Sequence, residues 1–361
     1  MSKEICMQRA LELANKAKGR TSPNPMVGAV IVKGYRIISE GYHKKAGTPH
    51  AEIVALKKAG NKAKDATMFV TLEPCCHTDK RTPPCTKAII ASGIKKVIIA
   101  TNDPNPKVSG KGIKELRKAG IETEVGILRS EAKHLNESYN KFIIKKKPFV
   151  VLKIAQSLDG KIATAKGESK WITGKTARKH VHQLRNDLDA VLVGIGTVMK
   201  DDPSLDCRLR GGRDPYRIIV DSGLRIPLKS KVLGYSDNKT IIATTNKASK
   251  RKISQINTLG AKVLVIKSKS GMVNLKALMK ELGKLDITGV MIEGGSSIAS
   301  SAISSEIVDR VMFFVAPKII GGTDSISSIG GKSPSLLGNA IKLKNLRAIT
   351  IGDDILIEGY L

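Results

Sequence analysis

Three short stretches in the N-terminal third of the chain constrain its fold most, because each carries a residue type that binds metal. His50 follows a Gly-Thr-Pro turn and begins an apolar-patterned helix. Pro74-Cys75 ends the strand-like run ATMFVTLE, and Cys85 opens a second helix. Unpaired N–H groups and the positive end of the helix dipole favour a thiolate at such positions, and thiolate is the form that binds metal. We therefore expect His50, Cys75 and Cys85 to meet around one ion.

The ion that this donor set predicts is Zn²⁺ in a catalytic site. One imidazole and two thiolates leave the fourth tetrahedral position open for a water, whose pKa zinc lowers towards ~7. Glu52, two residues after the histidine, is placed to take the water's proton and to protonate first a ring nitrogen and then a departing amine. The order H-x-E followed by P-C is the known signature of zinc-dependent deaminases. We predict that Glu52 is catalytic.

A closed, purely structural zinc site is the main alternative. It requires a fourth protein ligand, which Cys76 or His77 could supply, and it leaves no room for water. We interpret Cys76 as a residue that does not bind the metal. A non-catalytic, zinc-stabilised binding module is a second alternative, which predicts cofactor binding without ammonia release.

The length and the apolar pattern predict two α/β domains. A chain of 361 residues with 41% hydrophobic residues can bury two cores, and the scarcity of aromatic residues, 3%, suits strands of branched aliphatic residues. Strand-like and helical runs alternate on both sides of the basic segment KFIIKKKP, where we place a domain boundary. The expected domains are 1–146 and 147–361. In the second, we expect strands near 149–155, 189–193, 216–220, 239–244, 262–266, 288–292 and 309–315 and helices near 174–186, 273–283 and 295–304.

The formal charge of +30 raises the question of a polyanionic partner. The Lys and Arg residues are spread along the chain, and no stretch alternates basic with aromatic residues. This pattern favours a solvated surface that attracts small phosphorylated substrates over a nucleic-acid-binding one, although a nucleic-acid deaminase with a basic tail domain is a rival. No apolar run approaches the ~20 residues of a membrane span, so we expect no membrane partner and a cytoplasmic protein whose clustered cysteines bind metal.

Longer strings in both halves resemble one known family. SPNPMVGAVI, GYHKKAGTPHAE and TLEPCCHTDKRTPPC are similar to the deaminase half of the bifunctional riboflavin-biosynthesis deaminase/reductases, and LKIAQSLDGKIA, GESKWITG and MIEGG to their reductase half. The resemblance implies a three-layer, cytidine-deaminase-like domain followed by a dihydrofolate-reductase-like domain. It also implies a homo-oligomer that uses zinc and NADPH. The first half would remove the 2-amino group of a 2,5-diamino-6-ribosylamino-pyrimidinone 5′-phosphate, and the second would reduce the ribosyl chain to ribityl.

The resemblance further assigns residues of the first half to substrate. Asn24 in SPNP and His43 in GYH correspond to positions that contact the deaminase substrate, as do His77 and Lys80. This chain departs from the family in the segment CHTDKRTPPC, which is one residue longer before the second cysteine and lacks the usual glycine.

In the second half the resemblance implies a larger set of site residues. Guanidinium groups suit the grip on a ribose phosphate because their planar fork donates two hydrogen bonds at once. Lys153 and Asp201 are our hypotheses for the proton donor of the reduction. The substrate positions are Ser169, Arg185, Leu205, Arg208 and Glu293. The cofactor positions are Ala155, Trp171, Thr197, Asp201, Ser222, Gly295, Ser296, Ser297, Ile298, Ala299, Ser300 and Ser301.

Overall fold

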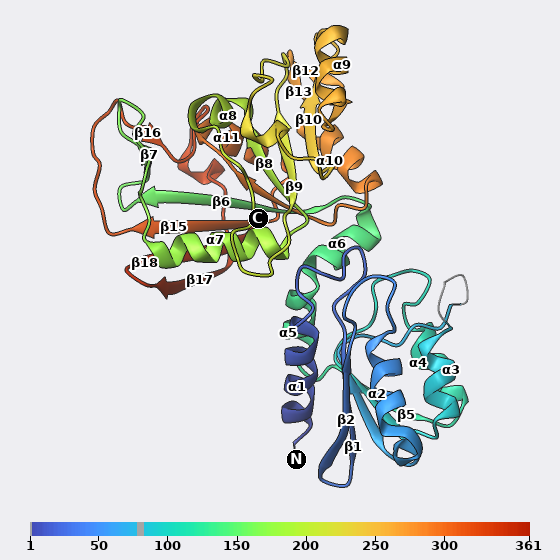
Figure 1. Ribbon diagram of the computed structural model, residues 1–361. Helices are drawn as coiled ribbons and strands as arrows, with labels where there is room; N and C mark the ends of the chain where they lie inside the picture. The colour runs from blue at the N-terminus through green and yellow to red at the C-terminus, as the bar shows by residue number, and fades with distance from the viewer. Residues whose placement is uncertain (1, 78–82) are drawn as a thin grey trace. The chain divides into compact units, whose positions relative to one another are not determined.

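The computed structural model describes residues 2–77 and 83–361 (Figure 1). The chain divides into two compact units, unit 1 with residues 1–146 and unit 2 with residues 147–361. Each unit consists of a β-sheet with helices packed against both of its faces.

Unit 1 contains a five-stranded mixed sheet in the order β2-β1-β3-β4-β5. β1 pairs antiparallel with both β2 and β3, whereas β3, β4 and β5 are parallel. The carboxyl ends of β3 and β4 therefore lie at one edge. The strands are β1 (Gly28–Lys33), β2 (Arg36–Tyr42), β3 (Thr67–Val70), β4 (Lys96–Ile99) and β5 (Glu122–Val125).

The strands of unit 1 alternate their side chains between two cores. Ala29 and Ile31 of β1 belong to the core beneath α2, α3 and α4, whereas Val30 and Val32 belong to the core beneath α1 and α5. This alternation is the period of two that a sheet covered on both faces requires. The helices are α1 (Lys3–Asn15), α2 (Ala51–Ala59), α3 (Cys85–Ala91), α4 (Lys111–Lys118), α5 (Arg129–Leu135) and α6 (Glu137–Lys145), with a 3-10 turn η1 (Gly60–Ala63).

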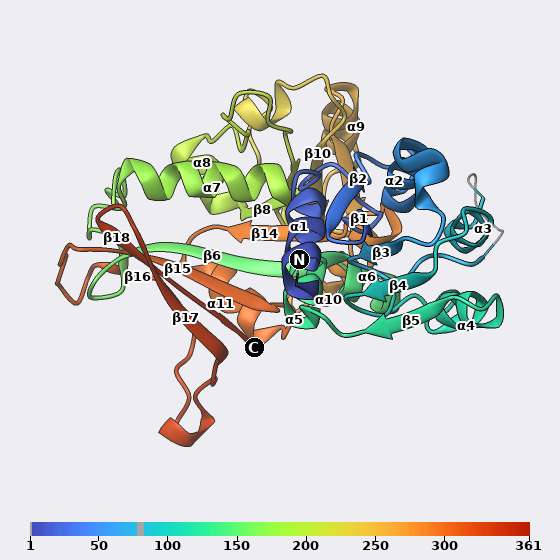
Figure 2. The same cartoon turned by 90° about the horizontal axis from the view of Figure 1, so that it is seen from below.

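Unit 2 contains a nine-stranded sheet in the order β11-β10-β9-β8-β14-β6-β15-β18-β17. In this spatial order, neighbouring strands are parallel from β11 as far as β15. β18 and β17 then add an antiparallel edge. Figure 2 shows the segment that leads into β17 reaching away from the rest of the unit. The strands are β6 (Phe149–Ser157), β8 (Ala190–Gly194), β9 (Tyr216–Val220), β10 (Thr240–Thr244), β11 (Lys262–Val265), β14 (Gly289–Glu293), β15 (Arg310–Ala316), β17 (Lys344–Ile351) and β18 (Asp354–Tyr360).

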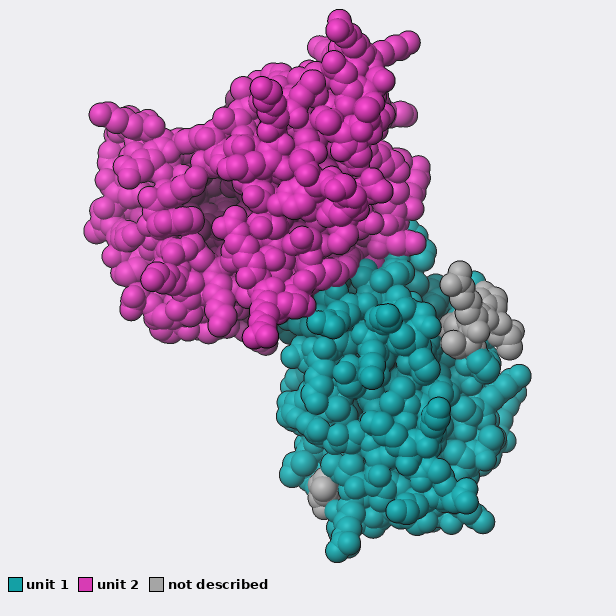
Figure 3. All heavy atoms as spheres, in the orientation of Figure 1, with its two compact units in different colours: residues 1–146 teal, residues 147–361 magenta. Residues whose placement is uncertain are grey.

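Helices cover the two faces of this sheet unequally. α7, α8 and α9 pack on one face and α10 and α11 on the other. On the side shown in Figure 3 the surface of unit 2 is hollowed, in the region where Figure 1 places β6 between α7 and α8. The helices are α7 (Lys175–Asp187), α8 (Ile195–Asp201), α9 (Lys250–Thr258), α10 (Leu275–Lys284) and α11 (Ser296–Ser304). Smaller elements are β7 (Lys161–Ala163), β16 (Ile326–Ser327), β12 (Ser268–Lys269), β13 (Met272–Val273), η2 (Lys231–Leu233) and η3 (Leu337–Asn339).

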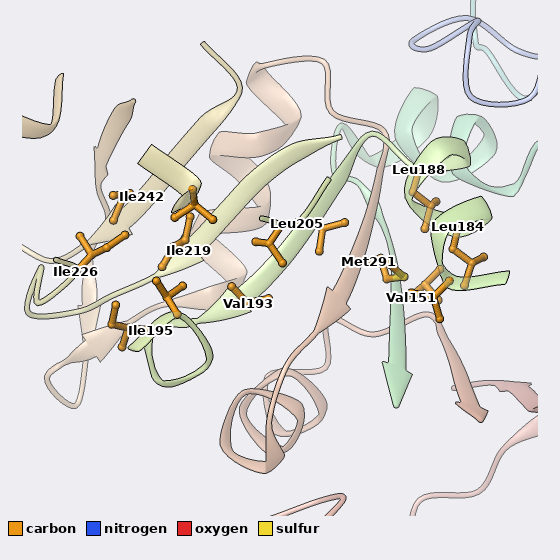
Figure 4. Packing of buried hydrophobic residues seen from close by; sticks show 14 of the residues in the cluster. Val151, Leu184, Leu188, Val193, Ile195, Leu205, Ile219, Ile226, Ile242 and Met291 are labelled. Atoms are coloured by element: carbon orange, nitrogen blue, oxygen red, sulfur yellow. The ribbon is translucent and has the colours of Figure 1, made fainter. Parts of the chain in front are cut away.

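Branched aliphatic side chains fill the core beneath α7, α8 and α9 (Figure 4). Val151 and Met291 come from the central strands β6 and β14, and Leu184 comes from α7. Because this packing fixes β6, β14 and α7 against one another, polar residues at the carboxyl ends of these strands are carried by rigid elements.

The expected α/β fold class is confirmed by the two mixed sheets, each of which is covered by helices on both faces. The strands and helices expected between 149 and 315 form as β6, β8 to β11, β14, β15, α7, α10 and α11. The sequence did not lead us to expect α8 or α9, nor the antiparallel pair of β17 and β18.

Helices in the described part of the chain are short. The longest, α1 and α7, have 13 residues each. Among residues 2–77 and 83–361, no helix combines the length and the apolar character that crossing a bilayer requires.

Two candidate functional sites

The structure of unit 1 brings the three expected metal ligands together. Candidate ligand atoms of His50, Cys75 and Cys85 all lie within 4.8 Å of one another. The Nδ1 atom of His50 is 3.2 Å from the sulfur of Cys85 and 3.6 Å from that of Cys75. His50 is the N-cap of α2 and Cys85 is the first residue of α3. Within the described residues neither Cys76 nor His77 belongs to this cluster, whose nitrogen and sulfur donors fit zinc.

Glu52 lies in the first turn of α2 beside this cluster. Its side chain is only 3% exposed, and its Oε2 atom is buried without a hydrogen-bond partner among the described residues. Burial raises the pKa of the Glu52 carboxyl above its ordinary value. Buried polar atoms in folded proteins nearly always have a partner, so an orphaned carboxylate oxygen indicates a missing ligand or water. The site therefore fits a metal with a reacting molecule beside it.

His43 and Asn24 form the adjoining wall. His43 is buried, and its ring lies edge-on to that of His50 with the centroids 5.4 Å apart. The Nδ1 atom of His43 lies 3.2 Å from the carbonyl oxygen of Pro49, so this nitrogen is the one that carries the proton. Nε2, 3.3 Å from the side-chain nitrogen of Asn24, then accepts from that amide. This network fixes the orientation of two side chains that were expected to contact substrate.

The other substrate positions expected in unit 1 lie after Cys75. His77 is half-buried and follows the cysteine pair at the end of a described segment. Lys80 lies outside the described residues.

In unit 2, a carboxylate joins two cations at the carboxyl edge of the sheet. Glu293 ends β14 and Lys153 lies opposite it in β6, with 3.2 Å between Oε1 and Nζ. The guanidinium of Arg185 from α7 donates to Oε2 of Glu293 at 2.9 and 3.1 Å. Burial alone would raise the pKa of Glu293, but the charges of Lys153 and Arg185 and their hydrogen bonds hold it at about 2. Glu293 is therefore a carboxylate throughout the neutral range.

Arg185 also connects this network to the segment after α8. It donates to the backbone oxygen of Asp206 at 2.8 Å, and Arg208 binds the Asp206 carboxylate at 3.2 Å. The backbone N–H of Arg208 donates to Nδ1 of His182, a residue of α7 that the sequence did not single out. Arg185 and Arg208, both expected to hold the ribose phosphate, are thus anchored to one short segment.

The remaining substrate positions differ in what they can present. Leu205 is 3% exposed and part of the core, so only its backbone, which has a φ of +55°, can face a ligand. Ser169 lies in the loop between β7 and α7. In the same loop the Nζ atom of Lys170 is 4.0 Å from Asp201, the last residue of α8.

Two helices begin side by side at the same edge of the sheet. β8 ends at Gly194 and β14 at Glu293, and these adjacent parallel strands lead directly into α8 and α11. Gly196 and Gly295 have open space where a side chain would be. Free N–H groups and an open approach at helix N-termini fit a cofactor phosphate.

Within the expected cofactor segment of α11, only some residues are available to a ligand. Ile298 and Ala299 are buried in the core, so they can contribute backbone groups alone. Gly330 and Gly331 pass so close to Ser296 and Ser300 that a Cβ atom on either glycine would collide with a serine hydroxyl. The outer face of this helix turn therefore lies against the loop 328–331.

The other expected cofactor positions surround this edge. Ala155 lies in β6 two residues after Lys153, and Thr197 lies in the first turn of α8. Ser222 follows β9, and its hydroxyl accepts a hydrogen bond from the N–H of Val273 at 3.0 Å.

Trp171 is held at the surface by two cations. The indole is 62% exposed, and the guanidinium of Arg178 lies 4.4 Å from its ring centroid. Arg178 also donates to the carbonyl oxygen of Thr173 at 2.6 Å, and Lys318 donates to the carbonyl oxygen of Trp171 at 2.9 Å. One face of an exposed aromatic ring is thus supported, which leaves the other for a planar ligand. Arg178 was not predicted, because Trp171 precedes α7 and its contact with Arg178 depends on the path of the loop between them.

Comparisons with protein families match both units. Residues 1–101 match the cytidine and deoxycytidylate deaminase zinc-binding region, and residues 148–357 match the RibD C-terminal domain.

Similar proteins and structures extend over nearly the whole chain. The riboflavin biosynthesis protein RibD of Aquifex aeolicus is 47% identical over 352 residues, which cover 97% of this chain and 96% of the relative. RibD of Escherichia coli is 38% identical over 372 residues, with 99% of each chain covered. The structure of Acinetobacter baumannii RibD, form 1, matches with a TM-score of 0.89 at 38% identity, covering 99% of this chain and 98% of that one. A diaminohydroxyphosphoribosylaminopyrimidine deaminase/5-amino-6-(5-phosphoribosylamino)uracil reductase from Thermotoga maritima matches with a TM-score of 0.87 at 40% identity, with the same coverage.

Proposed function

This chain belongs to the RibD family of bifunctional riboflavin biosynthesis proteins, and on that premise we propose how its own residues divide two reactions. It is a zinc-dependent hydrolytic deaminase and an NADPH-dependent reductase. The deaminase acts on 2,5-diamino-6-ribosylamino-4(3H)-pyrimidinone 5′-phosphate. The reductase then gives 5-amino-6-ribitylamino-uracil 5′-phosphate.

For deamination, we propose that His50, Cys75 and Cys85 hold the zinc. Zinc, when bound, supplies a Lewis acid that lowers the pKa of water to about 7. The Glu52 carboxylate takes the proton of the attacking water at its orphaned Oε2 and passes it to the pyrimidine ring nitrogen. It then takes the second proton, from the hydroxyl that has added to the ring carbon, and gives it to the amine, which leaves as ammonia.

Substrate orientation in unit 1 falls to His43 and Asn24. Their mutual hydrogen bond and the Pro49 carbonyl fix both side chains before substrate arrives. His77 and Lys80 complete the grip in this proposal. Positioning of this kind lowers the entropic cost of reaching the transition state.

For reduction, the residues at the carboxyl edge of the unit 2 sheet bind and protonate the sugar. NADPH, when bound, supplies a hydride. Lys153, held by Glu293, is our first candidate for donating the proton to the ring oxygen as the sugar opens, with Asp201 as the second. Ser169, Arg185, Leu205 and Arg208 hold the phosphorylated sugar. The helix starts of α8 and α11, with Ala155, Trp171 and Ser222, hold the cofactor.

One observation supports this proposal most: three metal-ligand atoms lie within 4.8 Å of one another beside a buried carboxylate oxygen that has no hydrogen-bond partner among the described residues. The test supplies the diaminopyrimidinone phosphate with and without NADPH and follows ammonia and nicotinamide absorbance. We expect ammonia in both cases and NADPH oxidation only after deamination. Cofactor binding with no ammonia release would favour the non-catalytic binding module.

We also propose that the chain forms a homo-oligomer through the β17 edge. Among the described strands β17 pairs only with β18, and all of its side chains except Ile351 are exposed, among them Leu346 at 63% and Ile349 at 45%. An apolar edge strand of this length favours aggregation unless another chain covers it, and two copies can pair with each other symmetrically. Replacing Leu346 with lysine should lower the molecular mass in solution, measured by light scattering.

Small phosphorylated molecules are the ligands that we propose, with no nucleic-acid partner. The charge of +30 is distributed over the sequence without interleaved aromatic residues. A mobility shift with tRNA that persists at physiological salt would contradict this. We propose a cytoplasmic location because none of the five cysteines, all of which lie within residues 2–77 and 83–361, forms a disulfide, as expected in a reducing compartment.

A further inference from the structure

Glu73 is a buried carboxylate that neither reaction uses. Its side chain is 3% exposed, and no Lys or Arg of the described residues pairs with it. Backbone N–H groups satisfy it instead. Oε2 accepts from Gly110 at 3.0 Å and from Asp103 at 3.3 Å, and Oε1 accepts from Ile113 at 3.3 Å.

These donors connect two segments that are distant in sequence. Gly110 is the N-cap of α4 and Ile113 lies in its first turn. Glu73 lies two residues before Cys75 in the segment that leaves β3. The carboxylate therefore fastens the start of α4 to the chain that carries a proposed metal ligand.

The backbone of α4 is in close contact with the segment that carries Glu73. A Cβ atom on Gly112 would lie 2.2 Å from the carbonyl oxygen of Pro74, so α4 packs directly on the residue that precedes Cys75. The N–H of Glu73 donates to the carbonyl oxygen of Thr101 at 3.0 Å, which ties the same segment to the end of β4. The segment that leads into Cys75 is thus held by α4 on one side and by the chain that follows β4 on the other.

The segment from Asp103 to Gly110, which we call the Val108 segment, lies against the metal cluster. Val108 is fully buried and packs with Cys75 and Cys85 in one small apolar cluster. The same segment is held at its other end by Asp103, whose Oδ1 accepts from the hydroxyl of Tyr139 and from the N–H of Asn105, both at 2.9 Å. Glu73 and Tyr139 therefore hold the two sides of the Val108 segment over the cysteines.

We propose that Glu73 is a positioning residue of the metal centre, which holds Cys75 and the Val108 segment where three-ligand zinc binding requires them. It rests on the proposed assignment of His50, Cys75 and Cys85 as zinc ligands. A glutamine of the same shape would turn an NH₂ group towards backbone donors and would leave some of them unpaired in the interior. We expect the Pro74-Cys75 segment to shift in this variant, because a shift would let the unpaired N–H groups find other partners.

A matched control separates metal positioning from general stability. Glu40 is also a carboxylate of unit 1 with a fixed role, since Arg9 binds it in a bidentate manner and so joins α1 to β2. It is not part of the metal cluster. Glu40→Gln should lower the melting temperature without changing zinc affinity.

The test measures the zinc dissociation constant of the full chain by competition with a chromogenic chelator. We expect Glu73→Gln to raise this constant about tenfold or more, the usual effect of losing an outer support of a metal ligand, and Glu40→Gln to leave it within twofold. With cobalt in place of zinc, Glu73→Gln should weaken the thiolate-to-metal absorption band. Tyr139→Phe, which loosens the far side of the same segment, should raise the constant about threefold.

An unchanged dissociation constant and cobalt band in Glu73→Gln would overturn the inference. If Glu73→Gln does not fold, an unchanged constant in Tyr139→Phe overturns it. Equal weakening by Glu40→Gln would also overturn it, because the effect would then follow from stability alone. Failure of the unsubstituted chain to bind zinc would instead refute the proposed ligand set.

Discussion

Lys153 and Glu293 face each other across two adjacent parallel strands, in register, with 3.2 Å between the ammonium nitrogen and a carboxylate oxygen. The same carboxylate receives two hydrogen bonds from Arg185. Because one anion is shared by two cations, the ammonium of Lys153 is oriented without being neutralised by a carboxylate of its own. A charged donor at the carboxyl edge of the sheet is what the proposed protonation of the sugar needs.

Replacement of the two proton-donor candidates should separate hydride transfer from cofactor binding. We expect Lys153→Ala to lower the rate of NADPH oxidation by about 100-fold or more while NADPH still binds, because general acid catalysis contributes about that much. Asp201→Asn tests the second candidate in the same assay. Stopped-flow absorbance measures the rate, and full activity in both variants would remove the hypothesis.

The Glu293 network should also make stability depend on acid pH. The pKa of Glu293 is about 2 in the folded chain against an ordinary value of 4.5, so the unfolded chain binds more protons between these values. The contribution is therefore complete above about pH 4.5, where the difference between the two pKa values corresponds to about 3 kcal/mol, and it is lost as pH falls towards 2. Thermal melts at a series of pH values measure this effect. Between pH 2 and 4.5, the melting temperature of unit 2 should change less with pH in Glu293→Gln than in the unsubstituted chain.

Glu306 supplies the control for this slope. It pairs with Lys276 at 2.7 Å, and its side chain is 81% exposed, so solvent screens the pair. Glu306→Gln should keep the slope of the unsubstituted chain. A flattened slope in both variants would show that the effect is not specific to the buried network.

Zinc content should distinguish Cys85 from Cys76, the second of the two neighbouring cysteines that follow β3. Cys85→Ser is expected to lose bound zinc, because it removes one of three ligands within 4.8 Å of one another. Cys76→Ser should retain it, since Cys76 lies outside that cluster. Metal analysis after dialysis measures both. Zinc loss in Cys76→Ser would support the closed structural site.

The single tryptophan of the chain offers a direct signal of cofactor binding. If the exposed face of Trp171 receives the nicotinamide, NADPH should quench the fluorescence of Trp171. The NADPH concentrations that give half of the quenching and half of the maximal reduction rate should then be similar. Arg178→Lys keeps the charge but loses the planar stack at 4.4 Å, so it should raise KM for NADPH several-fold with little change in kcat. Fluorescence that stays constant at saturating NADPH would refute the placement of Trp171.

The sequence predicted most of the parallel strands and the meeting of His50, Cys75 and Cys85, because both depend on local patterns. Buried strands appear as short aliphatic runs, and each ligand adjoins a helix start or a strand end. Antiparallel β17 was missed although it is a strand of eight residues, since all of its side chains are exposed or half-buried and it carries no core pattern.

Contacts between distant segments could not be predicted in this way. The donors to Glu73 lie 30 to 40 residues further along the chain, and Glu293 is 140 residues from Lys153. Backbone N–H donors leave no trace in residue identity, so the support behind the TLEPC segment is visible only in three dimensions. Arg178 beneath Trp171 depends likewise on the path of the loop that precedes α7.

The most direct test of the account measures bound zinc and ammonia release together in Glu52→Ala. We expect about one zinc per chain and ammonia release slowed by about 100-fold or more, with NADPH oxidation on pre-deaminated substrate unchanged. Ammonia release close to that of the unsubstituted enzyme, with zinc retained, would contradict it.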